Sequence, residues 1–189
     1  MITASQIQDL RRADSVYQNT SNLINRIAEL KRERHPFFLT ACEFDDILKW
    51  KLKGQYGRQE EHRAMNSDEV IRAVTGLALA ITHENEDYEL ELRVNILCSL
   101  RGVAVPVASA VLTLVYPTQY AVIDFRNWRQ IFGERKTGFS LHDYKQYMEQ
   151  MRHLANELNW TVQEVDLAIQ EYDYRHDGDA QQIVGRERR

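Results

Sequence analysis

The stretch LRGVAVPVASAVLTLVYPTQYAVIDFRNW, residues 100–128, holds a glycine turn, an apolar helix and one aspartate in an otherwise apolar run. Gly102 permits the left-handed backbone of a tight turn after a helix that we expect to end near Ser99. Pro106 suits the first turn of the next helix, where a missing N–H costs little. Two helices joined in this way form a helix–hairpin–helix, whose exposed amides can hold a phosphate oxygen. An ordinary helical hairpin with a glycine turn has the same spacing.

Asp124 lies between Ile123 and Phe125, where an ionised carboxylate is costly to bury unless it has partners. One explanation is that it caps a helix formed by RNWRQIF, residues 126–132. The other is that the carboxylate is held there for chemistry. The two roles are compatible, because an aspartate at a helix start is fixed in place and kept ionised by the helix dipole.

Helical spacing dominates the remaining sequence, and we expect an all-α bundle of several helices. Apolar residues between 70 and 81 form a clear helical stripe, while YAVIDF, residues 120–125, is the one stretch compatible with a short strand. Four helix starts read as capping boxes: Thr40 with Glu43, Asn66 with Glu69, Ser140 with Asp143, and Thr161 with Glu164.

Length and composition are those of one ordinary globular domain, with 189 residues of which 43% are hydrophobic and 28% charged. We expect a single helical domain over residues 1–189, with a frayed tail over 177–189. No apolar run approaches the ~20 residues of a membrane span, and the N-terminus does not read as a secretory signal. The two cysteines, Cys42 and Cys98, lie far apart, which fits a reducing compartment. A cytoplasmic monomer is the resulting expectation.

The net charge of −4, from 24 basic and 28 acidic residues, argues mildly against nucleic-acid binding by overall charge. Charge is unevenly distributed, however. KWKLKGQYGR, residues 49–58, has four positive residues and no negative one, and RNWRQIFGERK, residues 126–136, has four against one glutamate. Acidic residues collect over 83–91 and 163–174. The sequence therefore permits a basic face on an acidic protein.

The hairpin pattern Leu100-x-Gly102-Val103, followed by Ala108, an apolar helix and VID ending at Asp124, resembles the helix–hairpin–helix DNA glycosylase superfamily. The similarity includes FDDILKWKLKGQYGRQ, residues 44–59, and covers about residues 40–132. Short bacterial members described as having an 8-oxoguanine-glycosylase-like fold share such features. The resemblance implies a glycosylase-like all-α fold, with a glycosylase-like core over about residues 36–176. It also implies an enzyme that flips a damaged or modified base out of DNA and cleaves its N-glycosidic bond.

Asp124 is the catalytic residue that this resemblance implies, with a carboxylate that stabilises positive charge on the sugar and orients water. Pro106 stands where bifunctional members carry a lysine, and Ala104 replaces the second hairpin glycine. Without an amine at position 106, we expect a monofunctional enzyme that uses water and leaves an intact abasic site. Lys51 or Lys53, acting from across the pocket, remains an alternative amine.

The remaining site residues follow from the same resemblance and from the basic loop. Residues expected to contact DNA or the flipped base are Gly102, Val103, Ala104, Gln55, Tyr56, Lys51, Lys53, Arg58, Trp50 and Arg126, with Gln55 filling the space that the base leaves. The carbonyls of Cys98, Leu100 and Val103 match positions that hold a monovalent cation in relatives. The six histidines show no metal-ligand spacing, so we expect no metal site and no other cofactor.

The substrate is left open between oxidised purines, alkylated purines and hypermodified phage pyrimidines, in base-excision repair or in defence against phage. Two other functions compete with the enzyme. Ala104 and Pro106 favour a non-catalytic helix–hairpin–helix DNA-binding module. A helical interaction protein with an accidental resemblance is the third.

Overall fold

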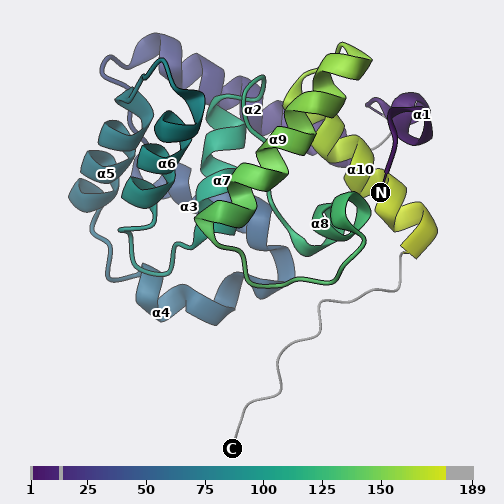
Figure 1. The fold of residues 1–189 in the computed structure, drawn as a ribbon. Coiled ribbons are helices and arrows are strands. Elements are labelled where there is room, and N and C mark those ends of the chain that lie inside the picture. Colours follow the sequence, from purple (N-terminus) through teal and green to yellow (C-terminus); the bar gives the residue numbers. More distant parts are fainter. Residues whose placement is uncertain (1, 13–14, 178–189) are drawn as a thin grey trace, which may run out of the picture.

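A computed structural model describes residues 2–12 and 15–177, which form helices and connecting loops without a strand. The α-helices are α1 Ala4–Ile7, α2 Ser15–Glu33, α3 Ala41–Leu52, α4 Glu60–Arg63, α5 Asp68–Ala80, α6 Glu86–Leu97, α7 Val105–Val115, α8 Phe125–Phe132, α9 Leu141–Leu158 and α10 Val162–Asp177. Two 3₁₀ segments, η1 Gln8–Leu10 and η2 Lys53–Gln59, complete them. The expectation of an all-α bundle is confirmed for this part of the chain (Figure 1).

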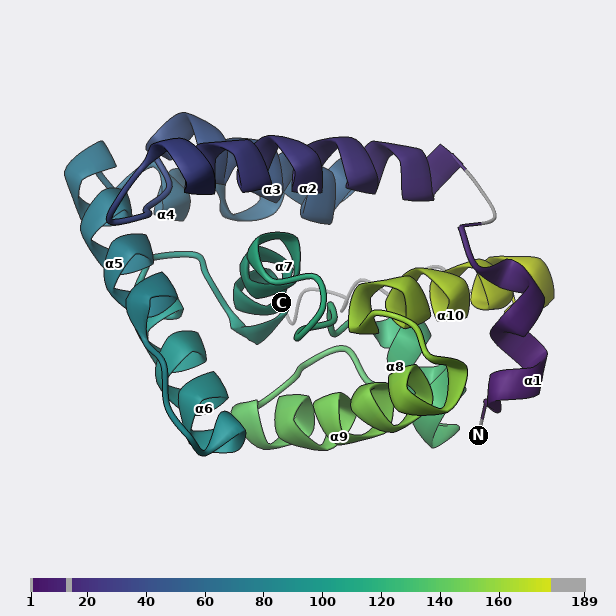
Figure 2. The same ribbon diagram turned by 90° about the horizontal axis from the view of Figure 1, so that it is seen from above.

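Helix α7 lies in the middle of the molecule. Figure 2 shows it enclosed by α2 and α3 on one side, α5 and α6 on the next, and α9 and α10 on the others. Its residues from Val107 to Val115 are all buried. A helix that is apolar all round must be covered all round, because each exposed apolar face costs free energy in water. The most apolar helix of the sequence therefore becomes the axis of the core.

Local capping signals explain where several of the helices begin. Thr40 with Glu43 and Ser140 with Asp143 form reciprocal capping boxes, as predicted, and Thr161 with Glu164 exchanges the same bonds ahead of α10. The prediction for α5 is wrong by one residue, since Ser67 rather than Asn66 accepts the capping bond from the Val70 amide. Asn66 instead binds the backbone N–H and carbonyl of Arg101 with its side-chain amide.

A short turn joins α6 and α7. Gly102 is left-handed with φ of 73°, and Pro106 lies in the first turn of α7. Ala104 is the N-cap of α7 in ordinary extended backbone, with φ of −113°. Alanine at position 104 therefore causes no backbone strain.

Residues 120–124 have no regular secondary structure, so the short strand that YAVIDF allowed is absent from the described chain. This segment is anchored instead by single hydrogen bonds to α7 and α10. Asp124 then caps α8, as predicted, and Gly133 ends α8 in the left-handed conformation.

The hydrophobic core also includes residues from the N-terminal helices. Ile7 and Ile27 are buried, and α1 packs against α10 while α2 packs against α7. The predicted tail at 177–189 lies outside the described residues, apart from Asp177 at the end of α10. Among residues 2–12 and 15–177, no helix combines the length and apolarity that crossing a membrane requires.

Candidate active site

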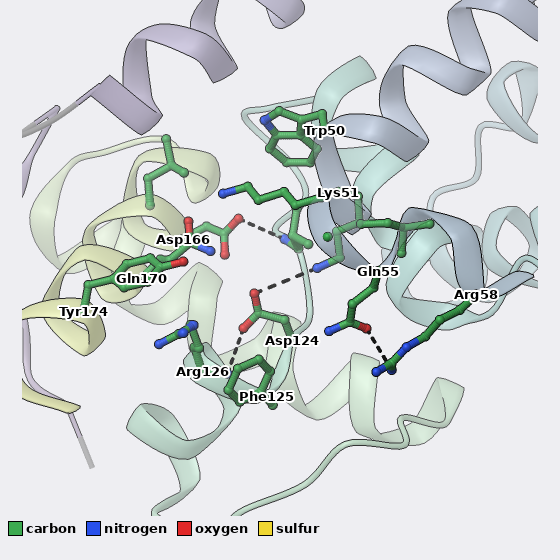
Figure 3. A pocket seen from close by; sticks show the side chains of 15 residues that line it. Trp50, Lys51, Gln55, Arg58, Asp124, Phe125, Arg126, Asp166, Gln170 and Tyr174 are labelled. Carbon is green, nitrogen blue, oxygen red and sulfur yellow. Dashed lines mark hydrogen bonds and ion pairs between the residues drawn. The ribbon is translucent and has the colours of Figure 1, made fainter. Parts of the chain in front are cut away.

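A cavity of about 560 Å³ lies where the end of α3 and the η2 loop face the start of α8 and one side of α10 (Figure 3). Its volume falls within the ~300–1,000 Å³ typical of small-ligand sites. Residues of α3 and η2 form one wall, the Val122–Asp124 segment and α8 form the floor, and Asp166, Gln170 and Tyr174 of α10 form the opposite wall. Three stretches far apart in sequence, residues 50–58, 122–126 and 166–174, therefore meet around one space.

Asp124 is fixed by one carboxylate oxygen and presents the other. Its Oδ1 accepts hydrogen bonds from the Arg126 and Asn127 amides, at 2.9 and 3.0 Å. The preceding residue is also held, because the Ile123 amide donates to Ser109 Oγ at 3.2 Å. Ser109 lies about one helical turn into α7, so Asp124 sits near the hairpin end of that helix. Its Oδ2 remains for the cavity.

Lys51 provides the positive charge opposite that oxygen. Its Nζ lies 3.9 Å from Asp124 Oδ2 and makes a long hydrogen bond of 3.5 Å to the Ile123 carbonyl. The Lys51 side chain is only 12% exposed. Burial lowers the pKa of its ammonium, and the nearby Asp124 carboxylate partly opposes that shift. An amine in these surroundings is both a partner for the carboxylate and a potential nucleophile.

Asp166 is a second carboxylate in the cavity wall, and the sequence analysis did not identify it. It accepts hydrogen bonds from the Val122 amide and the Tyr147 hydroxyl, each at 3.1 Å, and from the Asn127 side chain. Burial, and then the Asp124 charge, raise the pKa of Asp166 to about 7. Perturbed carboxyl groups in a cavity are typical of functional sites.

Gln170 and Tyr174 were also missed. They follow Asp166 by one and two helical turns, so all three lie on the same face of α10. The Gln170 amide has both a donor and an acceptor, and the Tyr174 ring is 42% exposed with the Arg126 guanidinium 4.2 Å from its centre. A planar ligand could be bound by such groups through its edge and its face.

Six of the predicted contact residues are brought together by the fold. The cavity is lined by Trp50, Lys51, Lys53, Gln55, Arg58 and Arg126, as well as by Asp124. Lys53 has an unusual backbone for a residue other than glycine, with φ of 45° and ψ of −121°, and begins the η2 loop. Such a conformation costs ~1–3 kcal/mol and persists only where the surrounding structure holds it.

Arg126 and Tyr56 are held by carboxylate partners within the protein. Arg126, expected to contact DNA phosphates, donates to the fully buried Asp173 at 2.8 Å, and Arg129 shares that carboxylate. Tyr56, expected to contact DNA or the flipped base, does not line this cavity. Its hydroxyl donates to Asp45, and its ring lies between the cations of Lys49 and Arg63.

The hairpin residues Gly102, Val103 and Ala104 do not line the cavity either. Val103 is buried, Ala104 is exposed, and Gly102 is covered by Arg63 of α4. A Cβ atom on Gly102 would lie 2.7 Å from Arg63 Cγ, so glycine is needed for close packing as well as for its backbone angle. Of the carbonyls suggested for a monovalent cation, that of Leu100 already accepts the Val103 amide at 3.2 Å.

The α10 residues were missed for a physical reason. QEVDLAIQEYDY reads as an amphipathic helix with a solvated acidic face, yet Asp166 and Asp173 are enclosed by α8 and α9. The one available signal was the position of Asp166 between Val165 and Leu167, which parallels Asp124 in its apolar run.

Within residues 2–12 and 15–177, no three His, Cys, Asp or Glu side chains are arranged to hold a metal ion. Comparison of the chain with protein-family models, curated proteins and solved structures gives no match. The candidate site therefore has to be judged on its own geometry.

Proposed function

We propose that the protein is a DNA N-glycosylase that excises a damaged or modified base by hydrolysis. The observation that carries the proposal is the Asp124 carboxylate, fixed by two amides through Oδ1 and directed with Oδ2 towards a cavity of about 560 Å³. A base drawn out of the DNA stack needs such a cavity, and its sugar needs a carboxylate at the edge.

Cleavage of the N-glycosidic bond passes through a state with positive charge on the sugar. A pre-positioned carboxylate stabilises this charge without having to reorganise, and it can also orient or deprotonate the attacking water. Asp124 needs no change of conformation for this role, because the start of α8 already holds it. The proposed reaction uses neither a metal nor an organic cofactor, so excision should be unchanged by EDTA.

Recognition of the base is assigned to the α10 wall and to Phe125. Gln170 can hydrogen-bond to the edge of a base, while Tyr174 and Phe125 offer aromatic faces on which it can stack. These groups suit any flat heterocycle, so the geometry supports a nucleobase as the substrate class and leaves the modification open.

DNA phosphates are assigned to the η2 loop. Among the cavity-lining cations, Lys51 and Arg126 have carboxylate partners, whereas Lys53 and Arg58 are exposed and form no ion pair within the described chain. Cations of this kind give affinity that does not depend on sequence and falls with salt. A monomer acting on DNA in the cytoplasm, in repair or in defence against phage, is consistent with this arrangement.

The direct test is a panel of duplexes and single strands that carry oxidised purines, alkylated purines or hypermodified pyrimidines. Abasic sites are detected by alkali cleavage after incubation with the wild-type protein or with Asp124→Asn. Excision of at least one base by the wild type, and none by the variant, supports the proposal. Salt-dependent DNA binding without excision of any base would instead identify a non-catalytic DNA-binding module, and absence of both would indicate a helical interaction protein.

A further inference from the structure

The Asp166 carboxylate forms hydrogen bonds at both ends of the turn that carries Asp124. Its Oδ2 accepts the amide of Val122, two residues before Asp124, at 3.1 Å. Its Oδ1 accepts the side-chain amide of Asn127, three residues after Asp124. The Asn127 backbone amide is in turn capped by Asp124 Oδ1 at 3.0 Å. Asp166 and Asp124 thus hold the same short segment from its two sides.

Tyr147 of α9 allows Asp166 to exist with or without a proton. The Tyr147 oxygen lies 3.1 Å from both Asp166 Oδ1 and the Val122 carbonyl. A hydroxyl has a single proton to donate. When Asp166 is ionised, it accepts a hydrogen bond from the Tyr147 hydroxyl. When Asp166 is protonated, it can donate a hydrogen bond to the Tyr147 oxygen, and the Tyr147 hydroxyl can then donate to the Val122 carbonyl.

Charges reach Asp166 from two elements packed around it. Asp124 repels its negative form, and Lys51 of α3 attracts it across the cavity. The other groups against it are the neutral amide of Asn127 from α8 and the Tyr147 hydroxyl from α9. With Asp166 ionised, two carboxylates face one ammonium. With Asp166 protonated, the charges of Lys51 and Asp124 cancel each other.

We propose that Asp166 is a positioning residue for Asp124: it fixes the turn that carries the catalytic carboxylate and supplies the negative charge that balances Lys51. Asp124 then remains available to positive charge on the sugar. This inference rests on the proposed function and extends it to a residue that acts through another. Because burial and the Asp124 charge raise the pKa of Asp166 to about 7, the site should gain its net negative charge as pH rises through neutrality.

The test is the pH profile of the single-turnover excision rate for three proteins. The wild type should show a rate that rises with pH around a midpoint near 7. Asp166→Asn has nearly the same shape but cannot ionise, so it should lose this rise and remain at the low rate. Lys51→Met removes the cation that Asp166 balances, so Asp124 should be available at every pH and the rise near pH 7 should become weaker. An Asp166→Asn protein that is merely slower, with the wild-type pH profile retained, would overturn the inference.

A second measurement needs no activity. An Asp whose pKa is raised on folding binds its proton more tightly in the native state, so its contribution to stability falls as pH rises between the unfolded and folded pKa values. Between pH 5 and 7, the unfolding constant of the wild type should increase by up to about tenfold per pH unit relative to that of Asp166→Asn. Equal pH dependence in the two proteins would show that Asp166 does not titrate there, and the inference fails. Absence of excision by the wild type on every substrate would instead refute the proposed function.

Discussion

The Lys51 ammonium lies 3.9 Å from Oδ2 of Asp124, the oxygen that the capping amides of α8 leave unused. Both side chains are mostly enclosed, at 12% and 19% exposed, so their charges interact more strongly than they would in bulk water. A sugar that develops positive charge in the cavity would compete with Lys51 for that oxygen. The Lys51–Asp124 interaction that stabilises the site is therefore the same one that a positively charged sugar would weaken in the proposed reaction.

Gly102→Ala should destabilise the protein more than Gly133→Ala does. Both glycines are left-handed, with φ of 73° and 74°, and alanine there costs ~1–2 kcal/mol from the backbone alone. Only at Gly102 would the new Cβ meet Arg63 Cγ, at 2.7 Å, while nothing lies within 4 Å of the Gly133 position. Forced overpacking adds ~1–3 kcal/mol. Urea unfolding of the two variants measures the difference, and equal losses would show that Arg63 moves aside.

Lys53→Gln and Arg58→Gln should each weaken DNA binding and reduce its salt dependence. If each cation contacts one phosphate, the slope of log K against log salt should become shallower by about 1 for each variant. Arg32→Gln on α2, also an exposed arginine, is the matched control and should retain the wild-type slope. Fluorescence anisotropy over a series of salt concentrations gives the three slopes. Unchanged slopes in both loop variants would remove the η2 loop from the DNA-binding surface.

Tyr174→Ala should weaken binding of a duplex that carries the substrate base, with little effect on unmodified DNA. Stacking of a base on an aromatic ring contributes ~1–3 kcal/mol, which corresponds to roughly 5- to 150-fold in Kd. Tyr88→Ala on α6 removes a ring of similar exposure away from the cavity and serves as the control. Equal losses for modified and unmodified duplexes would contradict a role in base recognition.

Capping residues made much of the helix framework predictable, because their partners lie within a few positions along the chain. Asp124 at the start of α8 and the Thr40 and Ser140 boxes needed no tertiary information. The left-handed turn at Gly102 and the position of Pro106 were equally local. Local backbone and hydrogen-bond preferences therefore predicted the glycine turn before α7 and the N-cap role of Asp124.

The rest of the site depends on contacts between distant segments, which spacing alone does not reveal. Asp166 and Asp173 look like solvent-facing acids on an amphipathic helix, and only the packing of α8 and α9 against α10 encloses them. Arg126 looked free to bind phosphate for the same reason, although Asp173 holds it. The sequence indicated which segments carry charge, and the fold determines which of those charges are already paired.

Sodium borohydride should trap no covalent complex between the wild-type protein and its excised substrate. The proposed nucleophile is water, and Pro106 offers no amine on the hairpin. Lys51 is the buried amine beside Asp124, so it is the residue that a trapped adduct would implicate. An adduct that disappears in Lys51→Met and persists in Lys53→Met would contradict the monofunctional mechanism and indicate an imine to the sugar.

The single-turnover excision rate of Asp124→Asn tests the central claim most directly. Asparagine caps a helix about as well as aspartate, so this variant should stay folded while it loses the negative charge. With Asp87→Asn, an exposed carboxylate on α6, as the control, we expect Asp124→Asn to be slower by about 100-fold or more while still binding DNA. A folded Asp124→Asn protein that excises the base at the wild-type rate would contradict the account.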